Sequence, residues 1–309
     1  MGTPTFYHTT VLLKEAVDGL AVKGDGVYVD ATFGGGGHSK EILGRMGPEG
    51  KLLAFDHDDD AWKNKPDDDR LVPVRENFRY INRFLRLHGY KTVDGILADL
   101  GVSSFQFDTA ERGFSIRFEG PLDMRMDKRS EVTAADVLKA YTEEQLHKMF
   151  EQYGEVRNAR ELARHIVAQR GRTKLNSIAA FKAMLEPIMK GNPNKYLAQV
   201  FQALRIEVND EMGALKEFLQ QAAASLKPGG RLSVITFHSI EDRIVKQFIK
   251  RGGWDEEEEK DLYGKVKTQA PMKPVNAKPI EPSAEEVKNN PRARSARLRI
   301  GEKQDEQKE

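Results

Sequence analysis

The chain has 309 residues, with 49 basic and 48 acidic side chains that leave a net charge of +1. It contains no apolar run of about 18 residues, so no membrane span is expected. The first 25 residues hold acidic side chains and no long apolar block, so no secretory signal is expected either. Cysteine is absent, which excludes disulfides, thiolate metal sites and a cysteine nucleophile. These features predict a globular cytoplasmic protein, and the balanced charge alone gives no sign of a nucleic-acid partner.

The first hundred residues alternate short β-type runs with helical patterns. Strands are predicted at 27–33, 51–56, 71–74 and 92–100, the third being weak because it contains a proline. Helices are predicted between them at 38–43 and 77–87, where apolar residues recur at helical spacing. Strands separated by helices imply βαβ units, so we expect an α/β fold with a parallel sheet.

The strand pattern stops in the middle of the chain and later returns. Helices are predicted at 137–153, 157–168, 177–190 and 196–205, followed by a helix at 211–226, a strand at 231–237 and a helix at 240–250. A helical block between strands of one sheet predicts an inserted domain at 104–209, within a core formed by 1–103 and 210–309. Near the end we expect an acidic loop at 255–261, an extended segment at 270–282, a strand at 295–300 and a frayed tail over the last eight residues.

The strongest local signal is a run of four glycines between a predicted strand and a predicted helix. Asp30 closes the strand, Gly34, Gly36 and Gly37 belong to the run, and His38 follows it. Residues without Cβ atoms let a ligand approach the backbone, and a helix N-terminus adds N–H donors. The P-loop signature and the third glycine of a dinucleotide fingerprint are both missing. The acidic Asp30 suits the ammonium end of S-adenosylmethionine (SAM), and a tight turn without a ligand is the alternative.

Three further residues lie where an α/β sheet binds ligands. Asp56 ends the second strand and could accept hydrogen bonds from the ribose hydroxyls of a nucleoside, which fits NAD as well as SAM. Phe78 could cover an adenine or could belong to the core. Asp99 ends the fourth strand, and carboxyl ends of strands are the ligand-binding edge of such sheets.

Seven ordered sequence blocks together resemble one bacterial family, the MraW methyltransferases of small-subunit ribosomal RNA. The blocks cover nearly the whole chain, which makes them far more specific than a glycine loop. They are HTTVLL at 8–13, DATFGGGGHS at 30–39, DLGVSS at 99–104, ERGFS at 111–115, GPLDMRMD at 120–127, FHSIEDR at 237–243 and NPRARS at 290–295.

The resemblance implies a SAM-dependent, Rossmann-like methyltransferase sheet with an inserted helical domain. The implied reaction moves a methyl group from SAM to N4 of a cytidine in the decoding centre of 16S rRNA, so 16S rRNA or the small subunit is the expected partner. The SAM contacts that carry over are Gly36, Gly37, His38, Asp56, Phe78, Asp99 and Gln106. Phe105 and Phe107, which flank Gln106, stand where the family usually has proline and an aliphatic residue.

The target amine is a poor nucleophile because its lone pair is delocalised into the ring, so we expect groups that accept its hydrogen bonds. Candidates are Asp99 and an acceptor on the following loop, either Ser103 or a backbone carbonyl. His238 could contact the base, take its proton, or cap the helix that begins near Ser239. No metal site is predicted, since the acids at 119–127 alternate with arginines and favour ion pairs.

Charge is unevenly distributed along the chain. Residues 153–205 contain ten basic and three acidic side chains, which favours RNA contact over an ordinary solvated helical surface. The RNA-binding candidates are Arg157, Arg160, Arg164, Arg170, Arg172 and Lys174, and a second basic stretch comprises Arg292, Arg294, Arg297 and Arg299. An RNA-binding assembly protein without turnover and an NAD-dependent oxidoreductase remain alternatives, and the oligomeric state is open.

Overall fold

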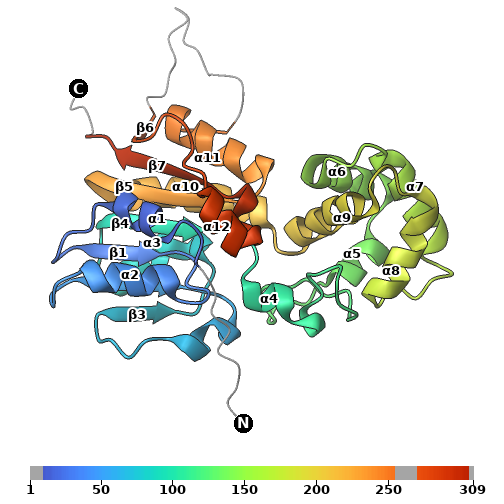
Figure 1. Ribbon diagram of the computed structural model, residues 1–309, viewed down its shortest axis with the longest axis horizontal. Coiled ribbons are helices and arrows are strands. Elements are labelled where there is room, and N and C mark those ends of the chain that lie inside the picture. The colour runs from blue at the N-terminus through green and yellow to red at the C-terminus, as the bar shows by residue number, and fades with distance from the viewer. Residues whose placement is uncertain (1–9, 255–269, 306–309) are drawn as a thin grey trace, which may run out of the picture. The chain divides into compact units, whose positions relative to one another are not determined.

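The computed structural model describes residues 10–254 and 270–305, and the chain within it forms two compact units (Figure 1). One unit comprises the residues up to Gly101 and from Gly213 onward, and the other comprises Val102–Met212. The acidic loop predicted at 255–261 lies outside the described residues. Within the described part, no helix has both the length and the apolar character needed to cross a membrane.

The first unit is built on one seven-stranded sheet. Its order is β3-β2-β1-β4-β5-β7-β6, in which β1 to β5 pair in parallel and β7 runs antiparallel to β5 and β6. The predicted α/β class with a parallel sheet is confirmed. The strands are β1 (Val27–Asp30), β2 (Lys51–Phe55), β3 (Leu71–Val74), β4 (Val93–Asp99), β5 (Leu226–Thr236), β6 (Met272–Pro274) and β7 (Arg297–Lys303).

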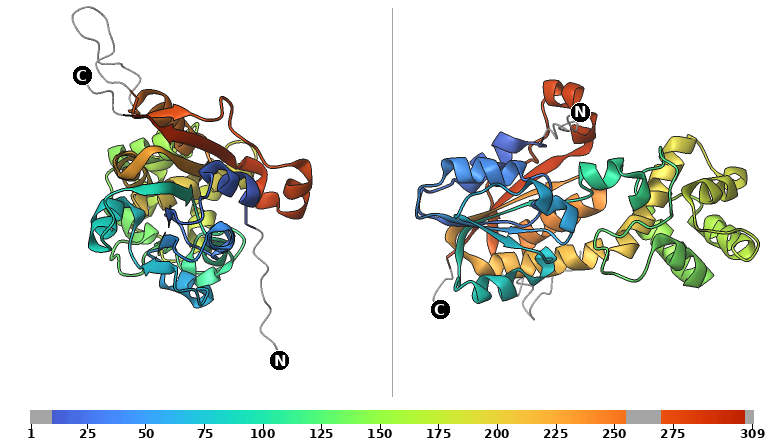
Figure 2. Two further views of the ribbon diagram at one scale, coloured as in Figure 1. Left: turned by 90° about the vertical axis from the view of Figure 1, so that its left-hand side faces the viewer. Right: turned by 90° about the horizontal axis from the view of Figure 1, so that it is seen from below.

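Helices cover both faces of this sheet, as the right-hand view of Figure 2 shows. One face packs against α1 and α2 in a core that contains Tyr28, Leu52 and Leu97. Phe55 packs edge to face on Phe84 of α3 on the other side. Burial on both faces explains why the central strands are continuous apolar runs. The helices of this unit are α1 (Leu13–Leu20), α2 (Gly37–Arg45), α3 (Ile81–Leu87), α10 (Glu211–Ser225), α11 (Ser239–Arg251) and α12 (Ala284–Asn289).

Strand boundaries differ from the predictions at β5 and β7. Lys227 to Gly230, which lie between the predicted helix at 211–226 and the predicted strand at 231–237, form a bulge inside β5, because Leu226 pairs with Val93 while residue 231 pairs with residue 95. The tail expected to fray from residue 302 continues β7 as far as Lys303. The strand gains partners on both sides, which holds its end in the sheet.

The second unit is helical and has its own apolar core, to which Leu138, Phe150, Phe181 and Leu204 contribute. The single helix predicted at 137–153 is wrong, because a capping box formed by Thr142 begins a new helix there. The helices are α4 (Ser104–Asp108), α5 (Ala134–Ala140), α6 (Glu143–Gly154), α7 (Ala159–Gln169), α8 (Ile178–Leu185) and α9 (Pro193–Val208). Short 3₁₀ turns lie at Asp59–Asn64, Phe78–Tyr80, Ala110–Arg112, Glu186–Ile188 and Pro291–Ser295.

Candidate functional site

Three predicted acids lie at the carboxyl ends of neighbouring parallel strands. Asp30 is the last residue of β1 and pairs with Ala54 of β2 and Leu97 of β4. Asp56 and Asp99 therefore each lie two residues beyond a partner of Asp30, at the same edge of the sheet. The sheet order reverses between β1 and β4, and such a switch point is where open α/β sheets bind ligands.

The loop after β1 is fixed to the neighbouring strand β4 by main-chain and side-chain hydrogen bonds. The Ala31 amide donates to the Leu97 carbonyl at 2.8 Å, and the Asp99 amide donates to Thr32 Oγ1 at 2.7 Å. The predicted strand at 27–33 thus ends at Asp30. Ala31 and Thr32 hold this loop against β4 through hydrogen bonds, and the glycines that follow lie at the edge of the sheet.

The glycine run uses backbone conformations and close contacts that side chains would disturb. Gly34 and Gly36 have φ values of +49° and +76°, in the left-handed region that favours glycine. A Cβ at Gly36 would lie 2.9 Å from Phe33 Cζ, and one at Gly37 would collide with the Thr10 side chain. Gly36 is the N-cap of α2, so the first amides of this helix also border the loop.

Asp30 is fully buried at 0% exposure and is hydrogen-bonded on both oxygens. Ser39 Oγ donates to Oδ2 at 2.7 Å, and the Thr32 amide donates to Oδ1 at 3.1 Å. Burial raises the pKa of Asp30 to about 6, although these hydrogen bonds oppose the shift. Because the carboxylate is inaccessible, it would act on a ligand through its charge and by positioning the loop. A direct contact between Asp30 and the ammonium of SAM stays a prediction.

Asp56 joins the glycine loop to the segment after β2. Its Oδ2 accepts from the Gly34 amide at 2.9 Å, and its Oδ1 accepts from the Asp58 amide at 2.8 Å. Each oxygen keeps a second lone pair, so the carboxylate can still accept hydrogen bonds from ribose hydroxyls. Burial raises the pKa of Asp56 to about 6, and the two amide hydrogen bonds oppose that shift.

Trp62, which the sequence analysis missed, supports this region. Its ring stacks on Phe33 with centroids 4.7 Å apart and planes inclined by 8°, and its Nε1 donates to the Asp56 carbonyl at 3.3 Å. Acidic residues surround Trp62 in the sequence, and such runs are typical of solvated loops. Its aromatic side chain among aspartates was the available signal of a buried contact.

Asp99 has an oxygen atom whose surroundings call for a ligand. Its Oδ1 is buried and has no hydrogen-bond partner within the described chain, while the side chain as a whole is 22% exposed. Burial raises its pKa well above the usual range, and the charges of Asp30 and Glu241 raise it further. A buried acceptor without a donor is costly, so an incoming N–H or O–H group would be favoured here.

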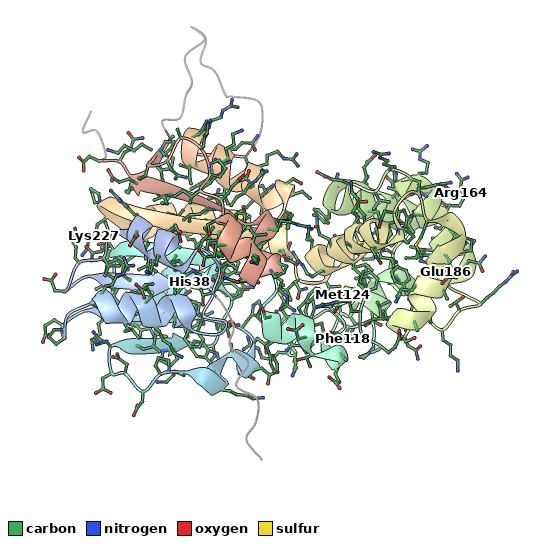
Figure 3. The ribbon with its side chains drawn as sticks, in the orientation of Figure 1. His38, Phe118, Met124, Arg164, Glu186 and Lys227 are labelled. Atoms are coloured by element: carbon green, nitrogen blue, oxygen red, sulfur yellow. The ribbon has the colours of Figure 1, made fainter. Side chains whose placement is uncertain are left out.

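His38 lies at the start of α2, where Figure 3 labels it, and is 4% exposed. Its Nε2 lies 3.2 Å from the Val11 carbonyl, and its Nδ1 lies 3.8 Å from Asp99 Oδ2. The first contact favours a proton on Nε2, which leaves Nδ1 as the atom that faces Asp99. The ring therefore forms part of the wall beside this acid.

The acidic residues at this edge of the sheet fit SAM, which carries an ammonium and a sulfonium. Asp30, Asp56 and Asp99 concentrate negative charge that burial makes unfavourable, and a cationic ligand would relieve this. The glycines themselves carry no side chains that would block a ligand. The ring of Phe78 is half-buried, and its centroid lies 5.1 Å from that of Phe218 with the planes inclined by 68°. Its contact with an adenine stays a prediction.

His238 occupies the capping position that was one of its predicted roles. It is the N-cap of α11, where its Nδ1 accepts from the Glu241 amide at 3.5 Å. Its Nε2 lies 3.0 Å from Glu241 Oε1 without hydrogen-bond geometry. Glu241, in the first turn of α11, is buried, accepts from the Phe237 amide at 2.9 Å and raises the pKa of Asp99.

Ser103 and Gln106 belong to the second unit, where they form the capping box of α4. Ser103 Oγ accepts from the Gln106 amide at 3.2 Å, and Gln106 Oε1 accepts from the Ser103 amide at 3.1 Å. Gln106 is buried. Both side chains thus define the start of α4, and their predicted roles toward the base and SAM stay predictions.

The predicted RNA-binding residues fall into two groups. Most are exposed on α7 or the loop after it, whereas Arg170 is half-buried and donates to the carbonyls of Leu138 and Tyr141 at 3.2 and 2.5 Å. Arg164 lies 3.6 Å from Glu143, and Figure 3 labels it on the surface of α7. The exposed members that have no ion-pair partner among the described residues are Arg157, Arg160, Arg172 and Lys174.

Two other charged groups serve the structure. Arg299 Nε donates to Asp242 Oδ1 at 2.6 Å, and Arg297 lies 3.3 Å from the same carboxylate, so these two members of the second basic stretch are engaged in ion pairs. The predicted pairing of acids with arginines in the GPLDMRMD block is confirmed by Arg125–Asp123, with the nitrogen and oxygen 2.8 Å apart.

Comparison with known proteins agrees with this arrangement. Residues 5–304 match the MraW methylase family. A ribosomal RNA small subunit methyltransferase H from Christiangramia forsetii is 55% identical over 96% of this chain and 98% of its own length. The proteins of the same name from Flavobacterium psychrophilum and Bacteroides fragilis are 55% and 54% identical, over 94% and 97% of this chain and 100% and 98% of their own lengths. The chain therefore belongs to the MraW methylase family of SAM-dependent methyltransferases.

Proposed function

We propose that the protein methylates N4 of a cytidine in the decoding centre of 16S rRNA, in the cytoplasm. Relatives that are 55% identical over nearly the full chain carry the name of small-subunit rRNA methyltransferases, which supports an rRNA substrate. The choice of base and atom rests on the sequence blocks and on the chemistry of the acidic edge. The observation that carries this choice is the buried Asp99 Oδ1 without a donor.

Asp99 suits an exocyclic amine because its open lone pairs can accept an amine N–H. Such a hydrogen bond draws the nitrogen lone pair out of the ring and toward the geometry needed for attack. SAM supplies a methyl group that the positive sulfur already activates. Methylation then forms one N–C bond, breaks one S–C bond and releases one amine proton, for which Asp99 is the acceptor that we assign. A cationic ligand beside Asp99 would favour its ionised form, which can take that proton.

The other acids and the loop have holding roles in this scheme. Asp56 would accept from the ribose hydroxyls, while its amide hydrogen bonds keep the carboxylate oriented. Asp30 would contribute negative electrostatic potential at the site and would fix the loop through hydrogen bonds with Ser39 and Thr32. Alignment of this kind supplies much of the rate enhancement in transfers between two bound reactants.

The second unit would hold the RNA backbone with its exposed cations. Arg157, Arg160 and Arg164 are spaced at three and four residues, so they share one side of α7 and its N-terminal approach. Arg172 and Lys174 extend the positive charge into the next loop. Arg170 is better assigned to holding the end of α5, since its guanidinium already donates to two carbonyls there.

The reaction is tested by incubating the protein with methyl-labelled SAM and small ribosomal subunits, followed by nucleoside analysis. Label in N4-methylcytidine is expected, label in another nucleoside would overturn the target atom, and no label would favour an assembly protein without turnover. Asp99→Asn should lower turnover at least 100-fold, which is the scale expected when a proton acceptor is lost. Calorimetry should still detect SAM binding by this variant. Unchanged turnover would contradict the role of Asp99, and calorimetric binding of NAD in place of SAM would favour an oxidoreductase.

The RNA surface is tested by a separate variant that replaces Arg157, Arg160 and Arg172 with alanine. Each lost phosphate contact should lower the dependence of log K on log salt by about 0.7, so the slope should fall by about 2. A control is Lys148→Ala on α6, since Lys148 already pairs with Glu144 at 2.8 Å. Equal salt slopes for the triple variant and the parent would contradict the assignment.

A further inference from the structure

An aromatic and arginine surface in the second unit has no part in the roles described so far. It begins on α4, where Phe105 is 50% exposed although it is a large apolar side chain. On the segment that follows, the guanidinium of Arg117 lies 5.3 Å from the ring centroid of Phe107 and 5.6 Å from that of Phe118, which Figure 3 labels. The side chain of Arg117 is 58% exposed. We call Phe105, Phe107, Arg117 and Phe118 the stacking surface.

This surface is held in place from the buried side. The capping box of Ser103 and Gln106 fixes the start of α4, and Gln106 is buried. Phe107 packs against the apolar core of the unit. Arg117 is further restrained by Asp108, 3.5 Å away at the end of α4. The planar groups are therefore presented by an ordered backbone, which lowers the entropy lost when a partner binds.

The neighbouring loop is anchored as well. Lys182 Nζ donates to the Ile116 carbonyl at 3.2 Å, and the Ile178 amide donates to the Gly120 carbonyl at 3.0 Å. Ser115 is buried and its Oγ accepts from the Arg117 amide at 3.3 Å. Anchors therefore lie on both sides of Arg117 and Phe118, and the exposure of these planar groups is a feature of a fixed segment.

We propose that the stacking surface binds an unpaired base of the RNA substrate. Phenyl rings and guanidinium planes are the groups on which proteins stack splayed-out bases. Arg117 also adds a positive charge that a phosphate can meet, which fits RNA better than an apolar protein partner.

The inference rests on the proposed RNA substrate and is tested by Phe105→Leu and Arg117→Lys. The first variant keeps an apolar side chain but loses the ring, and the second keeps the charge but loses the plane. Stacking on one ring typically contributes about 1–3 kcal/mol, so each variant should weaken binding of a fluorescein-labelled 16S rRNA transcript by about fivefold or more. The salt dependence of binding and the affinity for SAM should stay unchanged, because no phosphate contact or cofactor contact is removed.

The control is Val132→Ala, which alters another large apolar residue of the second unit that is 52% exposed. RNA affinity equal to the parent in both stacking variants would overturn the inference, as would an equal loss in the control. An unstructured oligoribonucleotide serves as a second probe and should show the same loss. Failure of the parent to methylate 16S rRNA would instead contradict the proposed function, so the two failures give different results.

Discussion

The buried carboxylate of Asp30 makes the ligand-free protein sensitive to pH in a direction that can be worked out. Asparagine at this position keeps an oxygen for the Thr32 amide and places an amide group opposite Ser39 Oγ, whose hydroxyl can turn to accept. Asp30→Asn therefore removes the charge while largely keeping the hydrogen bonds. Any constant cost of the substitution cancels when stabilities are compared across pH.

The magnitude follows from the raised pKa of Asp30. Folding moves this pKa from 3.8 to about 6, and at 1.36 kcal/mol per pKa unit the fully ionised group costs about 3 kcal/mol. Between these two values the folded state binds more protons than the unfolded state, so stability falls as pH rises from about 4 to 7. Asp30→Asn should abolish this contribution, so its stability relative to the parent should rise by about 2 kcal/mol between pH 4.5 and 7.5.

The assay is urea unfolding without ligand at several pH values between 4.5 and 7.5. Asp68→Asn is a suitable control, because hydrogen bonds from Arg70 lower the pKa of Asp68 to about 2 and its titration lies below this range. The difference between that control and the parent should stay flat. Parallel stability profiles for Asp30→Asn and the parent would show that Asp30 does not carry the assigned pKa and would refute the reasoning.

Three further results are expected from the same site and its surroundings. SAM should bind more weakly as pH falls from 7 to 5, because Asp30 and Asp56 have pKa values near 6 and their ionised forms favour a cation; calorimetry that finds a pH-independent affinity would contradict this. Gly36→Ala should cost at least about 1–2 kcal/mol of stability and weaken SAM binding, because φ is +76° there, whereas Gly44→Ala, with open space around it, should do neither in the same melts and titrations. Asp242→Ala should lower the free energy of unfolding by about 3–5 kcal/mol, because it leaves the buried Arg299 without its bidentate partner; a urea midpoint equal to that of the parent would rule this out.

The sheet could be predicted because its strands are apolar runs that end at acids or glycines. β1, β2 and β4 are buried on both faces, so burial alone makes them stand out in the sequence. Their order along the chain then places Asp30, Asp56 and Asp99 at one edge. The role of the glycine run could also be predicted, because a run of residues without side chains is typical of a loop whose backbone a ligand approaches closely.

The features that sequence analysis missed depend on contacts between distant residues. α12 has six residues, too few to be stable alone, and is tied to the N-terminal region by the Leu12 amide, which donates to Glu286 Oε1 at 2.8 Å. The bulge in β5 depends on its pairing with β4. Burial of Glu241 beside Asp99 is likewise set by tertiary packing, which local spacing does not record.

The assembly of the first unit from both ends of the chain has a consequence for synthesis on the ribosome. The second unit is continuous in sequence and can fold as soon as it emerges. β7, by contrast, follows the end of β4 by about 200 residues, which is roughly 10–40 s of bacterial translation. Until β5 and β7 are made, β4 has an unpaired edge and α1 lacks those two of the elements on which it packs. The nascent protein thus completes its cofactor-binding sheet last, and this interval is when it is most exposed to aggregation.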